Sequence, residues 1–419
     1  MASLNMKKRV VITGLGVISP VGNDVSSFWQ SLKDGKSGVG PTTSFDATAF
    51  DSRISAEVKN FDPTHYGISL KDTKRTAKFV QFAIAAAKQA MESSGLDARK
   101  EGGSRMGVVI GSGIGSLHTI EEEHKVLLNK GPSRLSPFLI PMLIVNEASG
   151  MVAIIHGLKG PNSCVATACA SGSHAIGEAY RMILYGDADV MLTGGTESCI
   201  VPTAVGGFCA LRALSTRNDD PKRASRPFDL QRDGFVMAEG CGLVVLESLE
   251  HAQKRNANIL AEIVGFGMSC DAFHITAPDP DGAGAAQAMS AALKDAGMKP
   301  EDITYINAHG TSTKLNDKIE TLSMKKAFGA YSKKVMVSST KSVTGHLLGA
   351  AGGVEFVACC LAIKDGVVPP TINYEYPDPD CDLDYVPYIA RKVNVTVCMS
   401  NSLGFGGHNA SLIVKKFKV

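Results

Sequence analysis

The sequence lacks the features that mark several specialised classes of protein. Its ten cysteines include no Cys-x-x-Cys pair, and most stand in apolar surroundings, as Cys359 and Cys360 do. This pattern argues against a structural zinc site and a disulfide framework, and it favours free thiols in a reducing compartment. The formal net charge is only +2, so no global excess of charge points to nucleic acid or to a membrane surface.

Long apolar segments are also missing. The strongest apolar run, residues 138–145, contains a proline and is too short to cross a bilayer. Basic residues at positions 7–9 precede an apolar start as in a secretory signal, but two glycines interrupt that start and no cleavage site follows. We therefore expect a soluble intracellular protein, in a bacterial cytoplasm or, alternatively, in a plastid or mitochondrial matrix.

Two glycine-containing segments lack parts of the nucleotide-binding motifs that they resemble. The triplet at residues 35–37 has no upstream glycine of a phosphate-binding loop. The turn at residues 111–116 misses the third glycine of a dinucleotide fingerprint, and no acidic residue ends a following strand at the right distance. An oxidoreductase with a catalytic cysteine is therefore the weaker alternative, which titration with NAD(P) would test.

The composition is that of a large globular protein. The chain has 419 residues, of which 44% are apolar and 20% charged, so it can bury a substantial core in two or three domains. Its 43 glycines exceed average usage. We therefore expect many tight turns and close contacts between helices and strands.

The segment around Cys169 predicts a reactive turn. Apolar and small residues lead up to Cys169, three small residues follow it, and a helical pattern runs from Ala175 to Tyr185. We interpret this as a strand, a sharp turn that exposes the sulfur, and a helix whose N-terminus favours the thiolate. The alternative is a buried structural cysteine.

The same arrangement recurs later in the chain. A predicted strand at Val335–Ser338 leads into a turn of small residues at 341–346, and a helix rich in small residues follows at Leu347–Ile363. This repetition predicts an internally duplicated α/β protein, whose halves, 1–257 and 258–419, meet helix to helix.

Two histidines stand in positions equivalent to that of Cys169. Cys169, His309 and His346 each lie in a turn of small residues after a predicted strand. Because ligands bind at the carboxyl ends of strands in α/β sheets, we expect these three turns to converge on one pocket. The glycine-rich turn at Leu403–Gly407 adds backbone N–H groups that suit an oxyanion.

A basic cluster opens a predicted helix over residues 71–91. Lys71, Lys74 and Arg75 lie on its first turns, where positive charge opposes the helix dipole. A solvated charged face is one interpretation, and a docking site for an anionic partner is the other.

Four segments resemble the motifs of one family. TACASGSHAIGEA, NAHGTSTKLND, TKSVTGHLLGAAGGVE and NSLGFGGHN occur in the order found in the β-ketoacyl-acyl carrier protein synthases of fatty-acid synthesis. The resemblance covers essentially the whole chain and is to the elongating class, synthase II, rather than to the initiating class with Cys-His-Asn. It implies a thiolase-like fold with α-β-α-β-α layers, in which 1–257 carries the cysteine and 258–419 the two histidines.

The resemblance implies a decarboxylative Claisen condensation. Cys169 would hold the acyl chain, with the backbone N–H groups of Cys169 and Phe405 as the oxyanion hole and Phe405 as a gate. His309 and His346 would bind the malonyl thioester and stabilise the enolate left by carbon dioxide. Lys341 would act as an electrostatic and orienting group, and the product would be a 3-ketoacyl-carrier.

The resemblance also implies substrate contacts. Thr311 and Thr313 would contact the phosphopantetheine arm of the carrier, although a threonine here can also cap a helix. Ile114 would line the acyl channel, where a simple core position is the alternative. The docking surface for the acidic acyl carrier protein would consist of Lys71, Lys74, Arg75 and Arg212.

Asn307, Glu355, Ser400 and Asn401 match a site where some members of the family hold a monovalent cation, K⁺ or Na⁺. No other cofactor is implied, because the phosphopantetheine arm arrives on the carrier. The expected partners are the carrier, malonyl and acyl thioesters and a second copy in a homodimer, with no nucleic acid and no membrane.

Two residues depart from the family pattern, and two related classes are less consistent with the sequence. Lys314 stands where a proline is common, and His408 where a threonine is common. A thiolase would carry a second cysteine at the turn of His309 or His346, and none is there. A chain-length factor would lack the active cysteine.

Overall fold

The computed structural model describes residues 8–418, so Lys7 of the basic segment and the outermost residues of both expected halves lie outside the described residues. Ten strands form one hydrogen-bonded sheet in the order β10-β9-β13-β14-β8-β1-β7-β6-β4-β5. The strands of the first half are β1 (Val10–Ile18), β4 (Met106–Gly111), β5 (Asn162–Val165), β6 (Val190–Glu197) and β7 (Gly240–Ser248). Those of the second half are β8 (Ala261–Cys270), β9 (Tyr305–Asn307), β10 (Met336–Ser338), β13 (Val397–Gly404) and β14 (His408–Lys415).

The two halves repeat one topology. In each half the strands, numbered from its own start, lie in the order third, second, fourth, fifth, first. The second strand is parallel to its two neighbours, whereas the fourth, fifth and first strands are antiparallel. β1 and β8 join the halves through a short antiparallel pairing at residues 10–12 and 261–263. The repetition confirms the internally duplicated α/β fold.

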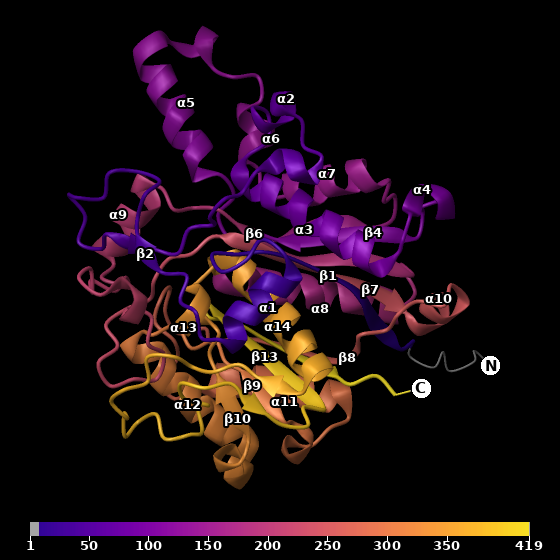
Figure 1. The fold of residues 1–419 in the computed structure, drawn as a ribbon, viewed down its shortest axis with the longest axis vertical. Helices are drawn as coiled ribbons and strands as arrows, with labels where there is room; N and C mark the ends of the chain where they lie inside the picture. Colours follow the sequence, from indigo (N-terminus) through magenta and orange to yellow (C-terminus); the bar gives the residue numbers. More distant parts are fainter. Residues whose placement is uncertain (1–7, 419) are drawn as a thin grey trace.

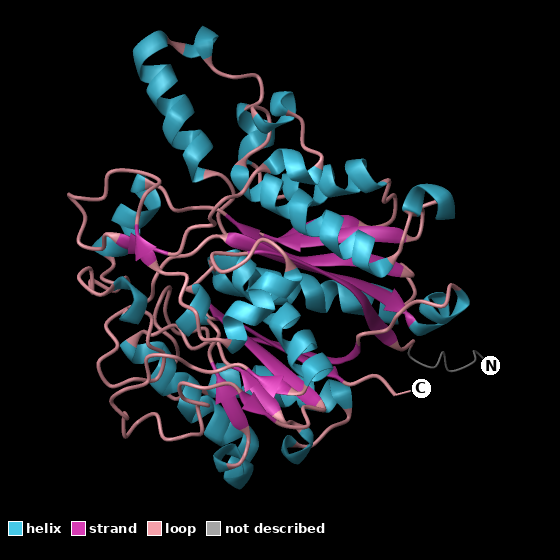
Figure 2. Ribbon diagram, viewed as in Figure 1, coloured by secondary structure: helices cyan, strands magenta, loops and turns pink. Residues whose placement is uncertain are grey.

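Helices cover both halves of the sheet and fill the space between them. Figure 1 shows α3 (Lys78–Ser94) and α7 (Glu147–His156) over the outer face of the first half. It shows α11 (Ala283–Ala296) and α12 (Lys314–Phe328) outside the second half, with α8 (Ser171–Leu184) and α14 (Ala351–Asp365) between the halves. The alternation of helix and strand layers in Figure 2 is the α-β-α-β-α arrangement expected of a thiolase-like fold.

Glycines allow the two central helices to meet. A Cβ atom on Gly172 of α8 would lie 2.9 Å from the backbone nitrogen of Gly353 in α14. A Cβ atom on Gly353 would lie 2.2 Å from the carbonyl oxygen of Gly242 in β7. A larger side chain at position 172 would separate α8 from α14, and one at position 353 would separate α14 from β7, so each contact depends on its glycine. The contact between α8 and α14 brings together their N-termini, which follow Cys169 and His346.

The remaining helices are shorter or more peripheral. They are α1 (Val25–Lys33), α2 (Leu70–Thr73), α4 (Ala98–Glu101), α5 (Leu117–Lys130), α6 (Leu139–Leu143), α9 (Pro202–Ala210), α10 (Leu249–Lys254) and α13 (Lys341–Thr344). Two further pairs of short strands are β2 (Gly40–Pro41) with β3 (Ile54–Ser55) and β11 (Val367–Val368) with β12 (Arg391–Lys392). None of the helices between residues 8 and 418 is long and apolar enough to cross a membrane.

The single helix predicted over residues 71–91 was wrong. The chain forms α2, leaves the helical conformation at Ala77, whose backbone is extended, and begins α3 at Lys78. Lys71 lies in the last turn of α2 and Lys74 is its C-terminal cap. Positive charge is favourable at the C-terminal cap, and α2 is only four residues long, so the predicted conflict of Lys74 with the dipole of a long helix does not exist.

Candidate active site

Cys169 lies on a strained turn between a strand and a helix. β5 ends at Val165, a single 3-10 turn covers Ala168–Ala170, and α8 begins directly afterwards. Ala168 has φ of +50°, which is unfavourable for a residue with a side chain. The Ser171 hydroxyl accepts a hydrogen bond from the Thr167 N–H at 2.9 Å and donates to the Ala168 carbonyl at 2.7 Å. The strand, turn and helix predicted around Cys169 are therefore confirmed.

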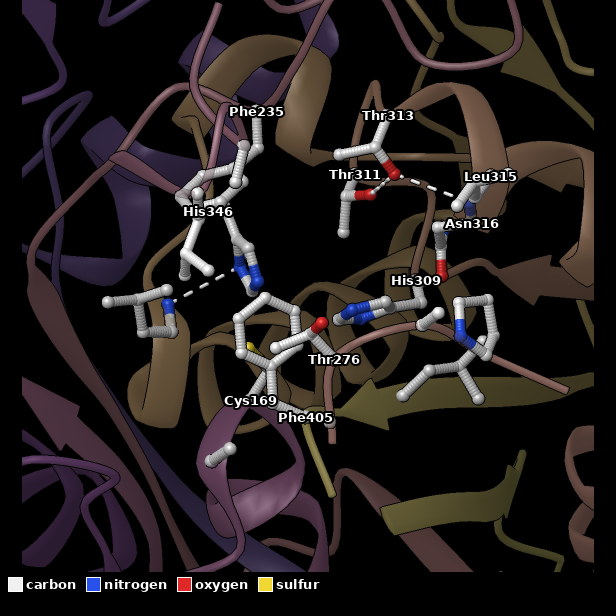
Figure 3. Close-up of a pocket in the computed structure, with 18 of the residues that line it drawn as sticks. Cys169, Phe235, Thr276, His309, Thr311, Thr313, Leu315, Asn316, His346 and Phe405 are labelled. Carbon is white, nitrogen blue, oxygen red and sulfur yellow. Dashed lines mark hydrogen bonds between the residues drawn. The ribbon is translucent and has the colours of Figure 1, made fainter. Parts of the chain in front are cut away.

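The structure brings Cys169 and both histidines to one cavity of about 470 Å³. His309 follows β9, and the N–H groups of His309 and Gly310 each donate to the buried Glu320 carboxylate at 2.8 Å. His346 follows α13. The two imidazole centroids are 5.2 Å apart and the rings are nearly perpendicular, at 86°. Figure 3 shows both rings beside Cys169 and Phe405.

Both imidazoles are neutral hydrogen-bond donors in this environment. Burial and the nearby Lys341 ammonium hold the pKa values of His309 and His346 well below the usual value, and the His346 ring lowers the pKa of His309 further. The Leu348 N–H donates to Nδ1 of His346 at 3.3 Å, so the ring proton resides on Nε2. Nδ1 of His309 is buried without a hydrogen-bond partner in residues 8–418.

Burial also governs the Cys169 thiol, and it raises the pKa to about 12. The Lys341 ammonium and the Phe405 backbone N–H act in the opposite direction. Desolvation therefore opposes the thiolate that was expected at the N-terminus of α8, and the thiol carries its proton at neutral pH. The proton must leave the sulfur when the sulfur attacks a substrate.

Lys341 acts from behind the cavity wall. Its side chain is 1% exposed, it is not a lining residue, and its Nζ forms an ion pair with Oε1 of Glu355. Burial raises the pKa of Glu355 to about 7, and the ammonium opposes that rise. The ammonium thus lies close enough to influence both imidazoles and the sulfur.

Other predicted substrate residues line the same cavity, namely Ile114, Arg212, Thr311, Thr313 and Phe405. The hydroxyls of Thr311 and Thr313 are 3.0 Å apart, and Thr313 also accepts the Asn316 N–H at 3.3 Å as the N-cap of α12. Thr313 therefore caps α12, as the alternative interpretation predicted, and it also lines the cavity.

The turn that carries Phe405 lies against the backbone of Cys169. A Cβ atom on Gly404 would be 3.3 Å from the Cys169 nitrogen. Gly406 and Gly407 follow Phe405 with φ of +85° and +74°. Two consecutive residues in this conformation favour glycine, and a Cβ atom on Gly407 would also lie 2.9 Å from the Asp271 side chain.

The three basic residues near position 74 do not join the cavity. Lys71, Lys74 and Arg75 are exposed on and after α2, away from the lining residues. The Arg75 guanidinium stacks 4.8 Å above the centroid of the Phe138 ring. Among the predicted basic residues, only Arg212 lines the cavity, and its side chain is exposed.

The four predicted cation ligands cluster in the core. Asn307 and Ser400 are register partners in β9 and β13, and the Asn307 side-chain amide donates to the Glu355 carbonyl at 3.5 Å. Oε2 of Glu355, Oγ of Ser400 and Nδ2 of Asn401 are buried without partners. The two unpartnered oxygens fit an alkali cation. Within residues 8–418, no group of three or more His, Cys, Asp or Glu residues could hold a metal ion.

The sequence did not predict several residues of the cavity. Phe235 packs edge-on against His346, with centroids 5.3 Å apart. Glu197, the last residue of β6, is buried in the cavity wall, and Glu320 holds the turn of His309. Of these three residues, only Glu197 had a signal in the sequence, because it is an acidic residue at the end of an apolar strand.

The chain belongs to the β-ketoacyl synthase family. The sequence model of the β-ketoacyl synthase N-terminal domain matches residues 7–252, and that of the C-terminal domain matches residues 260–375. The chain is 54% identical to the 3-oxoacyl-[acyl-carrier-protein] synthase 2 of Synechocystis sp. over 418 residues, with 100% of both chains covered. It is 55% identical to the protein of that name from Coxiella burnetii, with 98% of this chain and 99% of the relative covered.

Solved structures agree with this assignment. A β-ketoacyl synthase from Burkholderia phymatum superposes with a TM-score of 0.92 at 36% identity, covering 98% of this chain and 100% of the other. A type II PKS ketosynthase, solved in complex with its acyl-carrier protein, superposes with a TM-score of 0.91 at 37% identity, covering 99% and 100%. The thiolase-like fold expected from the motifs is therefore confirmed.

Proposed function

We propose that this protein is a 3-oxoacyl-[acyl-carrier-protein] synthase of the elongating type in type II fatty-acid synthesis. It joins an acyl chain to the two-carbon unit of malonyl-acyl carrier protein and releases carbon dioxide. The observation that carries the proposal is that one thiol and two neutral imidazoles line a single cavity. The curated relatives with this name match the chain from end to end.

The first half-reaction transfers the acyl chain. Sγ of Cys169 attacks the thioester carbon of the acyl-carrier, and the proton of the thiol passes to the departing carrier sulfur. The oxyanion of the tetrahedral intermediate receives hydrogen bonds from the backbone N–H groups of Cys169 and Phe405, which neighbouring turns hold close together. The carbon–sulfur bond to the carrier breaks, and the chain remains on Cys169.

The second half-reaction forms the carbon–carbon bond. His309 and His346 donate hydrogen bonds to the thioester oxygen of malonyl-carrier. The bond to its free carboxylate breaks, carbon dioxide leaves, and the electron pair forms an enolate that these donors stabilise. The enolate carbon attacks the acyl carbon on Cys169, the carbon–sulfur bond to Cys169 breaks, and the sulfur regains a proton. A neutral imidazole suits this role because it donates without protonating the enolate carbon.

The rest of the cavity suits the two ends of the substrate. Ile114 packs in an apolar cluster with Cys169 and is our proposed lining of the acyl channel. Thr311 and Thr313 are proposed to contact the phosphopantetheine arm, and Phe405 to gate the sulfur. Lys341 is proposed to orient the site electrostatically through its ion pair.

The carrier is proposed to dock on Lys71, Lys74, Arg75 and Arg212, all of which are exposed. Positive charge at these positions would attract an acidic carrier and guide its arm towards the cavity. The complex of a structural neighbour with its own acyl-carrier protein supports this kind of partner.

A homodimer is proposed because the first half of the sheet ends in an unpaired strand. β5 is the last strand in the order, so one of its edges is free in the single chain. Ile154 of α7, which packs on β5, is 71% exposed, and Ile140 of α6 and Leu128 of α5 are 60% and 71% exposed. A free strand edge and exposed apolar side chains both favour pairing with a second copy.

The remaining assignments are also proposals. The gap between the two family matches, residues 253–259, supports a division into halves at 257/258. Asn307, Glu355, Ser400 and Asn401 are proposed to hold K⁺ or Na⁺, which would neutralise buried polar oxygens and would supply no redox chemistry. The bacterial cytoplasm is the proposed location, with a plastid or mitochondrial matrix as the alternative.

The decisive experiment compares Cys169→Ala with Cys360→Ala, which removes a buried cysteine of α14 outside the cavity. Cys169→Ala should abolish condensation yet still release carbon dioxide from malonyl-carrier, because both imidazole donors remain. Cys360→Ala should retain both activities. Normal condensation by Cys169→Ala would disprove the nucleophile, and binding of NAD(P) without decarboxylation would favour an oxidoreductase instead.

A further inference from the structure

One buried carboxylate joins the acyl channel to the turn of a proposed catalytic histidine. Oε1 of Glu197 accepts the Ser112 hydroxyl at 3.0 Å and the Ile114 N–H at 3.3 Å. Oε2 accepts the Gly113 N–H at 2.8 Å and the Gly349 N–H at 3.1 Å. Glu197 has no exposed surface. It forms no ion pair with any residue between 8 and 418, so its charge is stabilised by these four hydrogen bonds.

The segments that Glu197 connects carry residues of the cavity. Residues 112–114 follow β4 and place Ile114 against Cys169 and Leu348 in one apolar cluster. Gly349 lies three positions after His346, in the short turn that begins α14. A Cβ atom on Gly349 would lie 2.6 Å from Oε2 of Glu197, so the backbone approaches the carboxylate closely only because this residue is glycine.

We propose that the ionised Glu197 is a positioning residue that fixes Ile114 and thereby restricts acyl-chain length, and that its protonation relaxes this restriction. The inference rests on the proposed function, in which Ile114 lines the acyl channel. It adds a group that controls the substrate range of that channel.

The hydrogen-bond pattern identifies which bond protonation weakens. The partners of Oε2 are two backbone N–H groups, which can only donate, so a proton on Oε2 would displace one of them and weaken the bond from the other. A proton on Oε1 is tolerated better, because the Ser112 hydroxyl can rotate and accept it. The Ile114 N–H then donates to an uncharged oxygen, so its bond, which is already the longest of the four, weakens. Protonation should therefore loosen Ile114 and leave Gly349 held.

This change falls near neutral pH. Burial raises the pKa of Glu197 to about 7, and the hydrogen bonds from Gly113, Ser112, Gly349 and Ile114 limit the rise. The titratable groups that face it are the thiols of Cys164, Cys169 and Cys199, whose pKa values burial also raises. These thiols stay neutral in this range. The restriction should hold above pH 7 and weaken below it.

The test measures kcat/KM for a short and a long acyl-carrier at pH 6 and pH 8 with the wild-type enzyme. The kcat/KM for the long chain divided by that for the short chain should be about three- to tenfold higher at pH 6 than at pH 8. This is the range expected for the loss of one buried hydrogen bond. The ratio removes effects common to both chains, such as any change in the reactivity of Cys169. An equal ratio at both pH values would overturn the proposal.

Glu197→Gln gives a second measurement. Its amide oxygen can accept from Gly113 and Gly349 while its NH₂ group takes the place of Oε1, as in the protonated carboxyl. The variant should show the wild-type pH 6 ratio at both pH values. A ratio that still changes with pH would contradict the assignment to Glu197.

Glu320→Gln is the matched control, because Glu320 is also buried and its pKa is also raised to about 7 by burial. It binds the turn of His309 and not that of Ile114. The condensation rates of this variant should change, but its ratio of kcat/KM for long and short chains should still depend on pH as in the wild type. If the wild-type enzyme condensed no acyl chain of any length, the proposed function itself would be refuted. If it condensed both chains with the same kcat/KM ratio at pH 6 and pH 8, only the role of Glu197 would be refuted.

Discussion

Replacement of His346 by alanine tests the electrostatic basis of the proposed reaction. The wild-type ring is neutral and carries its proton on Nε2, because the Leu348 N–H donates to Nδ1. The substitution removes one of two donors to the enolate in a buried site. Loss of a comparable oxyanion donor costs about 2.7–4 kcal/mol, so decarboxylation should slow by about 10²- to 10³-fold.

The assay should isolate decarboxylation from acyl transfer. Carbon dioxide release from malonyl-carrier is measured in a Cys169→Ala background, with and without His346→Ala. The substitution also leaves the Leu348 N–H without an acceptor, which should lower the free energy of unfolding by about 1–3 kcal/mol. Denaturant unfolding of the same variants separates this loss from the catalytic effect.

His156→Ala provides the control. His156 is on α7, burial lowers its pKa as well, and it is not a lining residue of the cavity. Its removal should leave the decarboxylation rate within about twofold, on the reasoning that sites without contact act independently. A folded His346→Ala variant that lost less than about threefold in rate would refute the donor role of this imidazole.

Three further predictions follow from the ion pairs, the surface charge and the free edge. Lys341→Met should lower the free energy of unfolding, because it leaves Glu355 buried without its ion-pair partner. The loss should approach about 3–5 kcal/mol at alkaline pH, where the carboxylate is ionised, and should be smaller at neutral pH, where Glu355 takes up a proton. Glu355→Gln should recover much of that loss without restoring activity. Lys74→Glu with Arg75→Glu should raise KM for acyl-carrier but not for a free acyl thioester. Lys88→Glu, on α3, is the control, and equal effects on both substrates would exclude docking at α2. Sedimentation should give the mass of a dimer, and a monomer at micromolar concentration would contradict the pairing at β5.

Local patterns in the sequence predicted the elements that carry the site. The strand, turn and helix around Cys169 were predicted because apolar spacing and small residues act over a few positions. The duplicated topology followed from the same pattern around His346. The break before α3 was missed because residues 71–78 contain no glycine or proline to mark it, whereas the extended backbone of Ala77 is seen only in the folded chain.

The arrangement of the site and its electrostatics depend on the tertiary structure. His309 and His346 lie far from Cys169 along the chain, and only the packed structure places all three in one cavity. The contact of α8 with α14 that Gly172 permits brings the turns of Cys169 and His346 together. The pKa values of the thiol and the imidazoles depend on burial, which no short segment specifies. Glu197 is a single acidic residue at the end of a strand, and only the packed chain surrounds it with four donors. The sequence alone therefore determined which chemical groups stand at the ends of the strands, and long-range packing decided their distances and charges.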